Sequence, residues 1–253
     1  MTPSLALLIG AAWAQTGPTG PADPYTPVQS GELFGTAHVL PDGRKQIRLT
    51  PLNGGFLLSH WGLTERVQLD VQIADSIAGP NVGVEYNFWA DGNSAASITV
   101  STDSTWSFKQ RTATALAQYT LGSGEYNRLN FGLGFGAGRL SVPNAAQNGT
   151  EITAWRTLPA SASFDHVVSD RRIRRYALAV NGGPALTGGN PEAELGYLWT
   201  YGFEKFRISA GGGLRYAPTF GDRLNAALIT AKQDPIPFPD VLPKLDLNLW
   251  WAW

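Results

Sequence analysis

The chain has 253 residues, of which 43% are hydrophobic and only 15% are charged, and its formal net charge is −1. Its mean hydropathy of −0.12 excludes a helical membrane protein, and the charge balance gives no basic signal for nucleic acid. The absence of cysteine excludes disulfides, thiolate metal sites and a thiol nucleophile. Many glycines and aromatics with few charges favour strands that are apolar on one face and polar on the other.

The N-terminal residues 1–14 predict a secretory signal peptide. LALLIGAAWA is a short apolar core, and Ala12, Trp13 and Ala14 give the small-x-small cleavage pattern, although the leading MTPS lacks Lys or Arg. A buried helix and a disordered tail are the alternatives. The proline-rich residues 15–31 show no periodicity, which predicts a mostly extended segment before a single domain at 32–253.

Apolar and polar residues then alternate strictly along the chain, first in RVQLDVQI at 66–73 and again at 128–138, 192–201 and 206–216. Such alternation predicts strands. Transmembrane barrels use strands of about 9–11 residues with aromatics at their ends, whereas strands of soluble sandwiches are mostly shorter. The sequence therefore predicts an all-β fold, a single closed antiparallel transmembrane β-barrel with its apolar face toward lipid. A soluble sandwich is the alternative at the level of the fold.

About 12 strands are predicted, with 10 or 14 as alternatives, and an even number is typical of bacterial barrels. The second strand is expected to contain a bulge or kink at 51–55, and the eighth loses its period after Pro159. Short turns are expected at one end, together with both chain termini, and longer links at the other. The short turns are 61–66, 89–94, 122–127 and 202–206. The predicted strands are 32–40, 44–60, 66–75, 81–90, 94–102, 109–121, 127–139, 150–160, 171–182, 191–202, 205–217 and 242–253.

The chain ends on an alternating aromatic strand, in which one face carries Leu245, Leu247, Leu249, Trp251 and Trp253. This ending resembles the sorting signal of bacterial outer-membrane β-barrels, which the barrel-assembly machinery engages by strand pairing. The resemblance implies a Gram-negative cell outer membrane location. It also implies that machinery as a transient partner, with outer-membrane lipid and lipopolysaccharide as surroundings. Trp253 would anchor the closing strand at the membrane interface.

A second resemblance concerns VLPDGRKQIRL at 39–49 and LSHWGLTERVQLDV at 58–71. These stretches resemble the opening of transporter-like barrels with a Leu-Pro-x-Gly hairpin and a Tyr-Gly-Leu-Thr-Asp-Arg turn, in which Trp61 and Glu65 replace Tyr and Asp here. The outer-membrane family named for the phenol-degradation meta pathway is among them. The resemblance implies passage of small solutes, including apolar or aromatic ones.

If the apolar faces meet lipid, the opposite faces line a lumen that carries charges of both signs. Such groups either pair across a narrow lumen or line a wet pore. We expect a passive channel for small solutes without a cofactor; the alternative is a structural or interaction barrel with a closed lumen. Inward glycines such as Gly211 and Gly213 either leave a ligand path or relieve curvature. The predicted lumen-lining residues are Arg48, Arg66, Asp70, Glu85, Arg128, Glu192, Glu194, Arg207, Arg215, Lys244 and Asp246.

Two further segments allow competing interpretations. The charge run SDRRIRRYAL at 169–178 is either an anion-selective patch or a strand end whose arginines meet headgroups, lipopolysaccharide phosphates or water. The long link 218–241, with a short helix predicted at 222–232, is either a constriction or an external lid.

Catalysis is not expected. The chain has three histidines, His38, His60 and His166, and only SFDHVVSD at 163–170 gathers Ser, Asp and His in sequence. A catalytic triad is defined by geometry rather than adjacency, so an outer-membrane hydrolase that uses His166 is the third alternative. No metal-ligand spacing and no nucleotide-binding glycine loop is present, which predicts neither metal nor cofactor.

Overall fold

The computed structural model describes residues 36–50, 56–72, 81–91, 94–105, 110–123, 127–144, 149–169, 172–181, 192–202, 205–217 and 239–253, with 229, 234 and 237. The predicted signal peptide at 1–14, the segment 15–31 and most of the link 218–241 lie outside the described residues. Within the described part, no helix is long and apolar enough to cross a bilayer.

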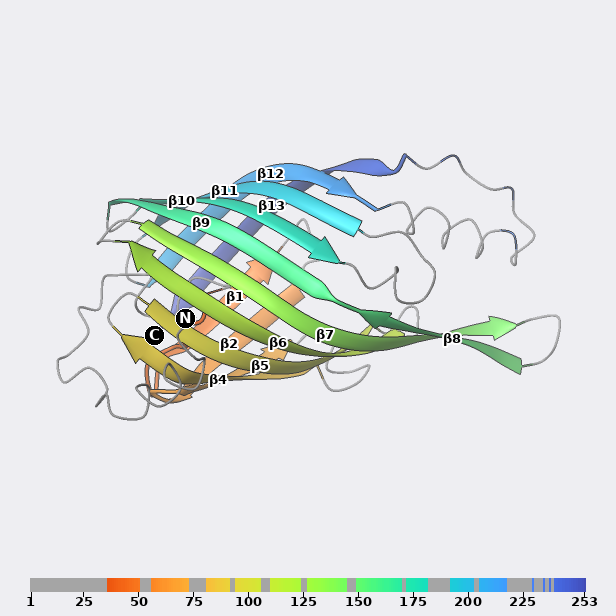
Figure 1. Cartoon of the computed structure of the whole chain (residues 1–253), viewed down its shortest axis with the longest axis horizontal. Helices are drawn as coiled ribbons and strands as arrows, with labels where there is room; N and C mark the ends of the chain where they lie inside the picture. The colour runs from red at the N-terminus through yellow and green to blue at the C-terminus, as the bar shows by residue number, and fades with distance from the viewer. Residues whose placement is uncertain are drawn as a thin grey trace, which may run out of the picture.

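Thirteen strands in the described part form one antiparallel sheet that closes on itself (Figure 1). Strand β1 pairs with β13, and β6 with β7, which completes the ring. The strands are β1 (Lys45–Thr50), β2 (Phe56–Thr64), β3 (Val67–Gln72), β4 (Val82–Asp91), β5 (Ser94–Thr105), β6 (Gln110–Ser123), β7 (Asn127–Asn144), β8 (Gly149–Thr157), β9 (Pro159–Ser169), β10 (Arg172–Asn181), β11 (Glu192–Gly202), β12 (Phe206–Tyr216) and β13 (Val241–Ala252).

The closed barrel has twelve positions in its wall, because β8 and β9 share one. The first half of β7 pairs with β9, and its second half pairs with β8. In Figure 1, β7 and β8 extend past the neighbouring strands. The predicted closed antiparallel barrel of about twelve strands is confirmed, and the soluble sandwich is wrong.

Two of the predicted strands are wrong, and their errors cancel in the count. Residues 36–40 are described without strand structure. The predicted strand 44–60 is two strands, β1 and β2, which pair antiparallel, so the chain reverses between Thr50 and Phe56 instead of bulging. The eighth wall strand also continues to Ser169 through β9. Its alternating Ala and Ser residues give too little contrast in hydropathy for the period to be recognised.

The side chains alternate between an apolar outer face and a polar inner face. Leu133, Leu195 and Leu245 are 65%, 59% and 67% exposed, whereas the inward-facing Thr120 and Ser209 are fully buried. A soluble protein would bury the leucines and expose the hydroxyls. This inverted distribution is the arrangement of transmembrane β-barrels.

The connections divide the barrel into a short-turn end and a long-connection end. The short-turn end carries the links 64–67, 91–94, 123–127, 169–172 and 202–206, together with the start of β1 and the chain's last residue. The turn at 169–172 was not among those predicted. Here β13 closes the barrel: Lys45 and Trp253 exchange two backbone hydrogen bonds of 2.9 and 3.0 Å. The last residue therefore belongs to a wall strand.

Aromatic side chains gather outside the barrel near the short-turn end. Phe206 and Trp251 are cross-strand partners with ring centroids 5.3 Å apart, and Arg172 lies over the ring of Tyr201. Aromatic rings are enriched where hydrocarbon meets water. The rings at this end therefore match one of the two bands of strand-end aromatics that are typical of a transmembrane barrel.

Glycine allows the close approach of β11 and β12. A Cβ atom at Gly211 would overlap the carbonyl oxygen of Tyr197, and one at Gly213 would overlap that of Leu195. At Gly196, in contrast, the nearest atom would be 3.9 Å away. Gly211 and Gly213 thus fit the interpretation that inward glycines relieve strain in the closed wall, because a side chain at either position would overlap the neighbouring strand.

Candidate functional site: a lumen closed at the short-turn end

Residues 36–41, which we call the inner segment, enter the barrel: residues 36–40 are buried, and Pro41, where the segment leaves the lumen, is exposed. Ala37 and Leu40 have no exposed surface, and His38 is buried. Because these residues precede β1 at the short-turn end, they fill part of the lumen there. The predicted strand 32–40 is therefore wrong over its described residues. These residues lie inside the lumen instead of forming part of the wall.

Three strands of the wall hold the inner segment through polar side chains on their inner faces. The Ala37 N–H donates to Thr120 Oγ1 of β6 at 2.8 Å, and Asn87 Nδ2 of β4 donates to the Ala37 carbonyl at 2.7 Å. The Leu40 N–H donates to Gln68 Oε1 of β3 at 2.9 Å. These bonds satisfy backbone groups of an extended segment that has no sheet neighbour of its own.

A tight turn connects the inner segment to β1 and docks on Gly62. The Arg44 N–H donates to the Pro41 carbonyl at 3.0 Å, and Gly43 has a φ of +74°, which favours glycine. A Cβ atom at Gly62 would overlap the Pro41 carbonyl. The predicted Leu-Pro-x-Gly hairpin therefore does contain a turn. Only the segment after the turn, β1, is a strand.

Across the lumen from the inner segment, apolar side chains from three strands form a buried cluster, which we call the floor. Val167 of β9, Ile173 of β10 and Trp250 of β13 are 8%, 2% and 3% exposed and pack as one cluster. The alternation in β13 correctly placed Trp250 on the polar face. Its role as a floor could not be recognised from the sequence, because a tryptophan there contradicts the polar pattern.

Next to the floor lies a buried ionic cluster. Asp165 has no exposed surface and accepts from Arg175 Nε and Nη2 at 2.6 and 2.9 Å and from Asn130 Nδ2 at 2.7 Å. Arg128, 1% exposed, is its cross-strand partner on β7. Sequence reasoning found Arg128 but missed Asp165 and Arg175, which lay in the segment without a period and in the charge run.

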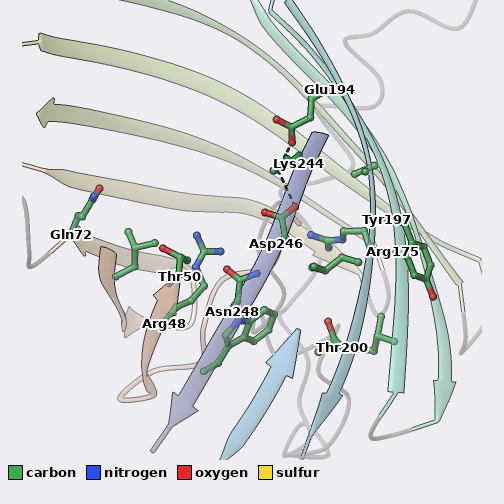
Figure 2. Close-up of a pocket in the computed structure, with 16 residues that line it drawn as sticks. Arg48, Thr50, Gln72, Arg175, Glu194, Tyr197, Thr200, Lys244, Asp246 and Asn248 are labelled. Atoms are coloured by element: carbon green, nitrogen blue, oxygen red, sulfur yellow. Dashed lines mark hydrogen bonds and ion pairs between the residues drawn. The ribbon is translucent and has the colours of Figure 1, made fainter. Parts of the chain in front are cut away.

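Between the floor and the long-connection end lies a cavity of about 460 Å³ (Figure 2). Lys244 of β13 lines the cavity, is paired with Glu194 of β11 and lies 3.2 Å from Asp246 Oδ2. Arg48 of β1 and Arg175 of β10 come from strands on either side of β13 in the wall. The lining also includes Thr50, Gln72 and Asn248. The cavity thus presents fixed charges of both signs and several neutral hydrogen-bonding groups, together with apolar side chains such as Leu58, Leu198 and Trp250.

The predicted lumen residues divide by level along the barrel. Arg48, Glu194, Lys244 and Asp246 line the cavity. Glu192 and Arg215 pair at 3.4 Å nearer the long-connection end. Arg128 and Arg207 are buried near the short-turn end, and Glu85, also buried, accepts from Ser97 Oγ at 2.6 Å. Asp70 Oδ1 lies 2.6 Å from His60 Nδ1.

Arg66 does not line the lumen. It is exposed in the turn between β2 and β3, where its N–H and that of Val67 both donate to Thr64 Oγ1 at 3.1 Å. The sequence alternation of 66–73 starts one residue before the strand does, and the Thr64 side chain fixes the turn there.

The described side chains of the segment 163–170 do not form a catalytic cluster. Asp165 points into the barrel, whereas His166, its neighbour in the strand, takes the opposite face. His166 Nδ1 lies 2.9 Å from Asn127 Oδ1 of the paired strand β7. Its described partner is thus an amide rather than a carboxylate.

Comparisons with known proteins give little guidance. No protein-family model matches the chain, and no curated protein matches it. Among solved structures, the chain is similar to BamA from Haemophilus ducreyi lacking POTRA domains 1–3, with 13% identity and a TM-score of 0.43. That similarity covers 68% of this chain but only 40% of the BamA chain.

Proposed function

We propose that the protein is a Gram-negative outer-membrane barrel that binds a small polar solute in its lumen and conducts it when the inner segment moves aside. The observation that carries this proposal is the cavity of about 460 Å³ with charged walls, inside a barrel whose outer face is apolar. Apolar exterior strands need a lipid surrounding, and a charged cavity inside them needs water or a polar ligand.

The lining favours a small hydrophilic solute over the apolar or aromatic one that the second resemblance implies. Lys244 lies between Glu194 and Asp246, and Arg48 faces the same space. An apolar solute would desolvate these groups without replacing their hydrogen bonds, whereas a small zwitterion or polyol supplies donors and acceptors.

On this proposal, the structure is the closed resting state, in which the inner segment occupies the short-turn end of the lumen. Three neutral side-chain hydrogen bonds hold the backbone of Ala37 and Leu40, and a tight turn connects the segment to β1. The floor and the ionic cluster, in contrast, are part of the strands. Conduction therefore requires movement of residues 36–41 rather than of the barrel.

A permanently closed structural barrel is the second candidate, and the Arg128–Asp165–Arg175 cluster favours it. Buried, hydrogen-bonded charges of this kind fix the interior and resist rearrangement. In either case we propose that β13 carries the assembly signal, with Leu245 and Trp251 facing lipid and the barrel-assembly machinery as transient partner. We propose no catalytic activity.

Liposome swelling tests this function. The mature protein, residues 15–253, is refolded, inserted into liposomes and challenged with isosmotic glycerol, glycine, succinate or lysine. Uptake of small polar solutes that is faster than in protein-free liposomes is expected, and it should increase when residues 36–41 are deleted. Equal swelling with and without correctly folded protein, in both forms, would favour the closed structural barrel.

A further inference from the structure

Three arginines form a cluster on the outer face of the wall near the long-connection end. Arg111 of β6 and Arg139 of β7 are direct cross-strand partners, and both are exposed. Arg156 of β8, also exposed, is opposite Ala137 and therefore diagonal to Arg139. We call these three residues the arginine cluster.

Among the described residues, the outer-face neighbours of the arginine cluster carry no negative charge. On the same outer face, the adjacent described positions along the three strands are Ala113, Ala137 and Ala154. Like charges directly opposite each other on paired strands are destabilising. Three strands that place arginines side by side among alanines are therefore arranged for an external anion.

The small residues also create a hollow that can hold such an anion. A groove of about 390 Å³ is lined by Arg111 and Arg139 with Thr102, Ser104, Ala113 and Ala137. Toward the barrel's middle, the outer face becomes apolar: Val100, Leu133 and Phe135 are 56%, 65% and 49% exposed. A ligand here would contact guanidinium groups at one end and hydrocarbon-facing side chains at the other.

We propose that the arginine cluster binds the phosphorylated headgroup of lipopolysaccharide, whose acyl chains lie along Val100, Leu133 and Phe135. Guanidinium groups bind phosphate oxygens through paired hydrogen bonds. These hydrogen bonds are stronger at the interface between lipid and water than in bulk water. Barrels of this type carry their longer connections outside the cell, which places the cluster in the leaflet that contains lipopolysaccharide. The site rests on the outer-membrane placement proposed above, but not on conduction.

Native mass spectrometry of the refolded protein tests this site, with bisphosphorylated lipid A, dephosphorylated lipid A and phosphatidylglycerol as probes. The wild-type chain should retain bisphosphorylated lipid A in preference to the other two. The triple variant R111Q/R139Q/R156Q should lose roughly a hundredfold in affinity, since each of the three arginines near a charged membrane surface contributes about fivefold. The charge-retaining R111K/R139K/R156K variant should keep a substantial part of that affinity.

The matched control is R172Q/R174Q, which removes two exposed arginines from the short-turn end. It should bind lipid A like the wild type, and an equal loss there would overturn the site in favour of general charge attraction. Equal retention of phosphatidylglycerol and lipid A would also overturn it. Failure of the folded wild-type protein to insert into phospholipid vesicles would overturn the membrane placement and the site together, whereas insertion without lipid A preference overturns the site alone.

Discussion

Gly43 and Gly62 form the joint on which the inner segment depends: the Gly43 N–H donates to the Gly62 carbonyl at 3.0 Å, and the Gly62 N–H donates to Arg44 at 2.8 Å. The missing side chain of Gly62 lets the Pro41 carbonyl approach the inner face of β2. Any side chain there must displace the turn, and with it the residues that fill the short-turn end.

The first prediction is that Gly62→Val loosens the inner segment. The chain contains no cysteine, so a single Ala37→Cys substitution gives a specific label site. A water-soluble maleimide should modify Ala37→Cys at least about tenfold faster when Gly62→Val is also present, because the fully buried position becomes accessible. Gly196→Val is the control, since Gly196 also faces inward but has space around it. Equal labelling rates in the two backgrounds would contradict the role of Gly62.

The second prediction concerns curvature. Gly211→Ala and Gly213→Ala should each lower the free energy of unfolding by about 1–3 kcal/mol, the usual cost of overpacking, because the added methyl overlaps a neighbouring carbonyl. Gly196→Ala should change it by much less. Urea unfolding in detergent, followed by tryptophan fluorescence, measures the difference. Equal effects at all three positions would show that the wall relaxes without cost.

The third prediction concerns the buried ionic cluster. Asp165→Ala leaves Arg128 and Arg175 buried without their carboxylate and should lower the free energy of unfolding by about 3–5 kcal/mol. Glu192→Gln, which breaks the more exposed 3.4 Å pair with Arg215, should cost at most about 1 kcal/mol. The same unfolding assay compares the two variants. A small effect of Asp165→Ala would mean that water reaches the cluster.

The fourth prediction concerns selectivity of the open lumen. In the Gly62→Val background, Lys244→Gln removes the positive charge between Glu194 and Asp246 and should shift permeation toward cations. The reversal potential in a salt gradient across a planar bilayer measures this shift. Arg66→Gln, in the exposed turn, should leave the reversal potential unchanged. A shift of equal size in both variants would place the selective charges outside the cavity.

The sequence was sufficient for most of the wall strands and insufficient for the interior. Alternation over β3, β7, β11 and β12 fixes which side chains face lipid, because that pattern is local and has a period of two. The turns that contain Gly or Thr were also predictable, because the residue types that favour a turn are local in the sequence. Where Ala and Ser alternate, as in β9, the two faces differ too little in hydropathy, so the strand was missed.

The interior depends on contacts between residues far apart in the chain. Thr120 and Ala37 are separated by 83 positions, and their hydrogen bond exists only because the barrel closes around the inner segment. Residues 36–40 were predicted as part of a strand, but all five are buried and none is in a strand, because they lie inside the barrel instead of in its wall. Similarly, only the cross-strand register brings Asp165 between Arg128 and Arg175.

Single-channel recording in a planar bilayer tests the central claim, that the inner segment closes a lumen that is otherwise able to conduct. We expect rare or small current steps for the wild-type chain and frequent, larger, salt-dependent steps for Gly62→Val. Folded Gly62→Val protein that is as silent as the wild type, despite faster labelling of Ala37→Cys, would contradict it. The lumen would then be closed by the strands themselves.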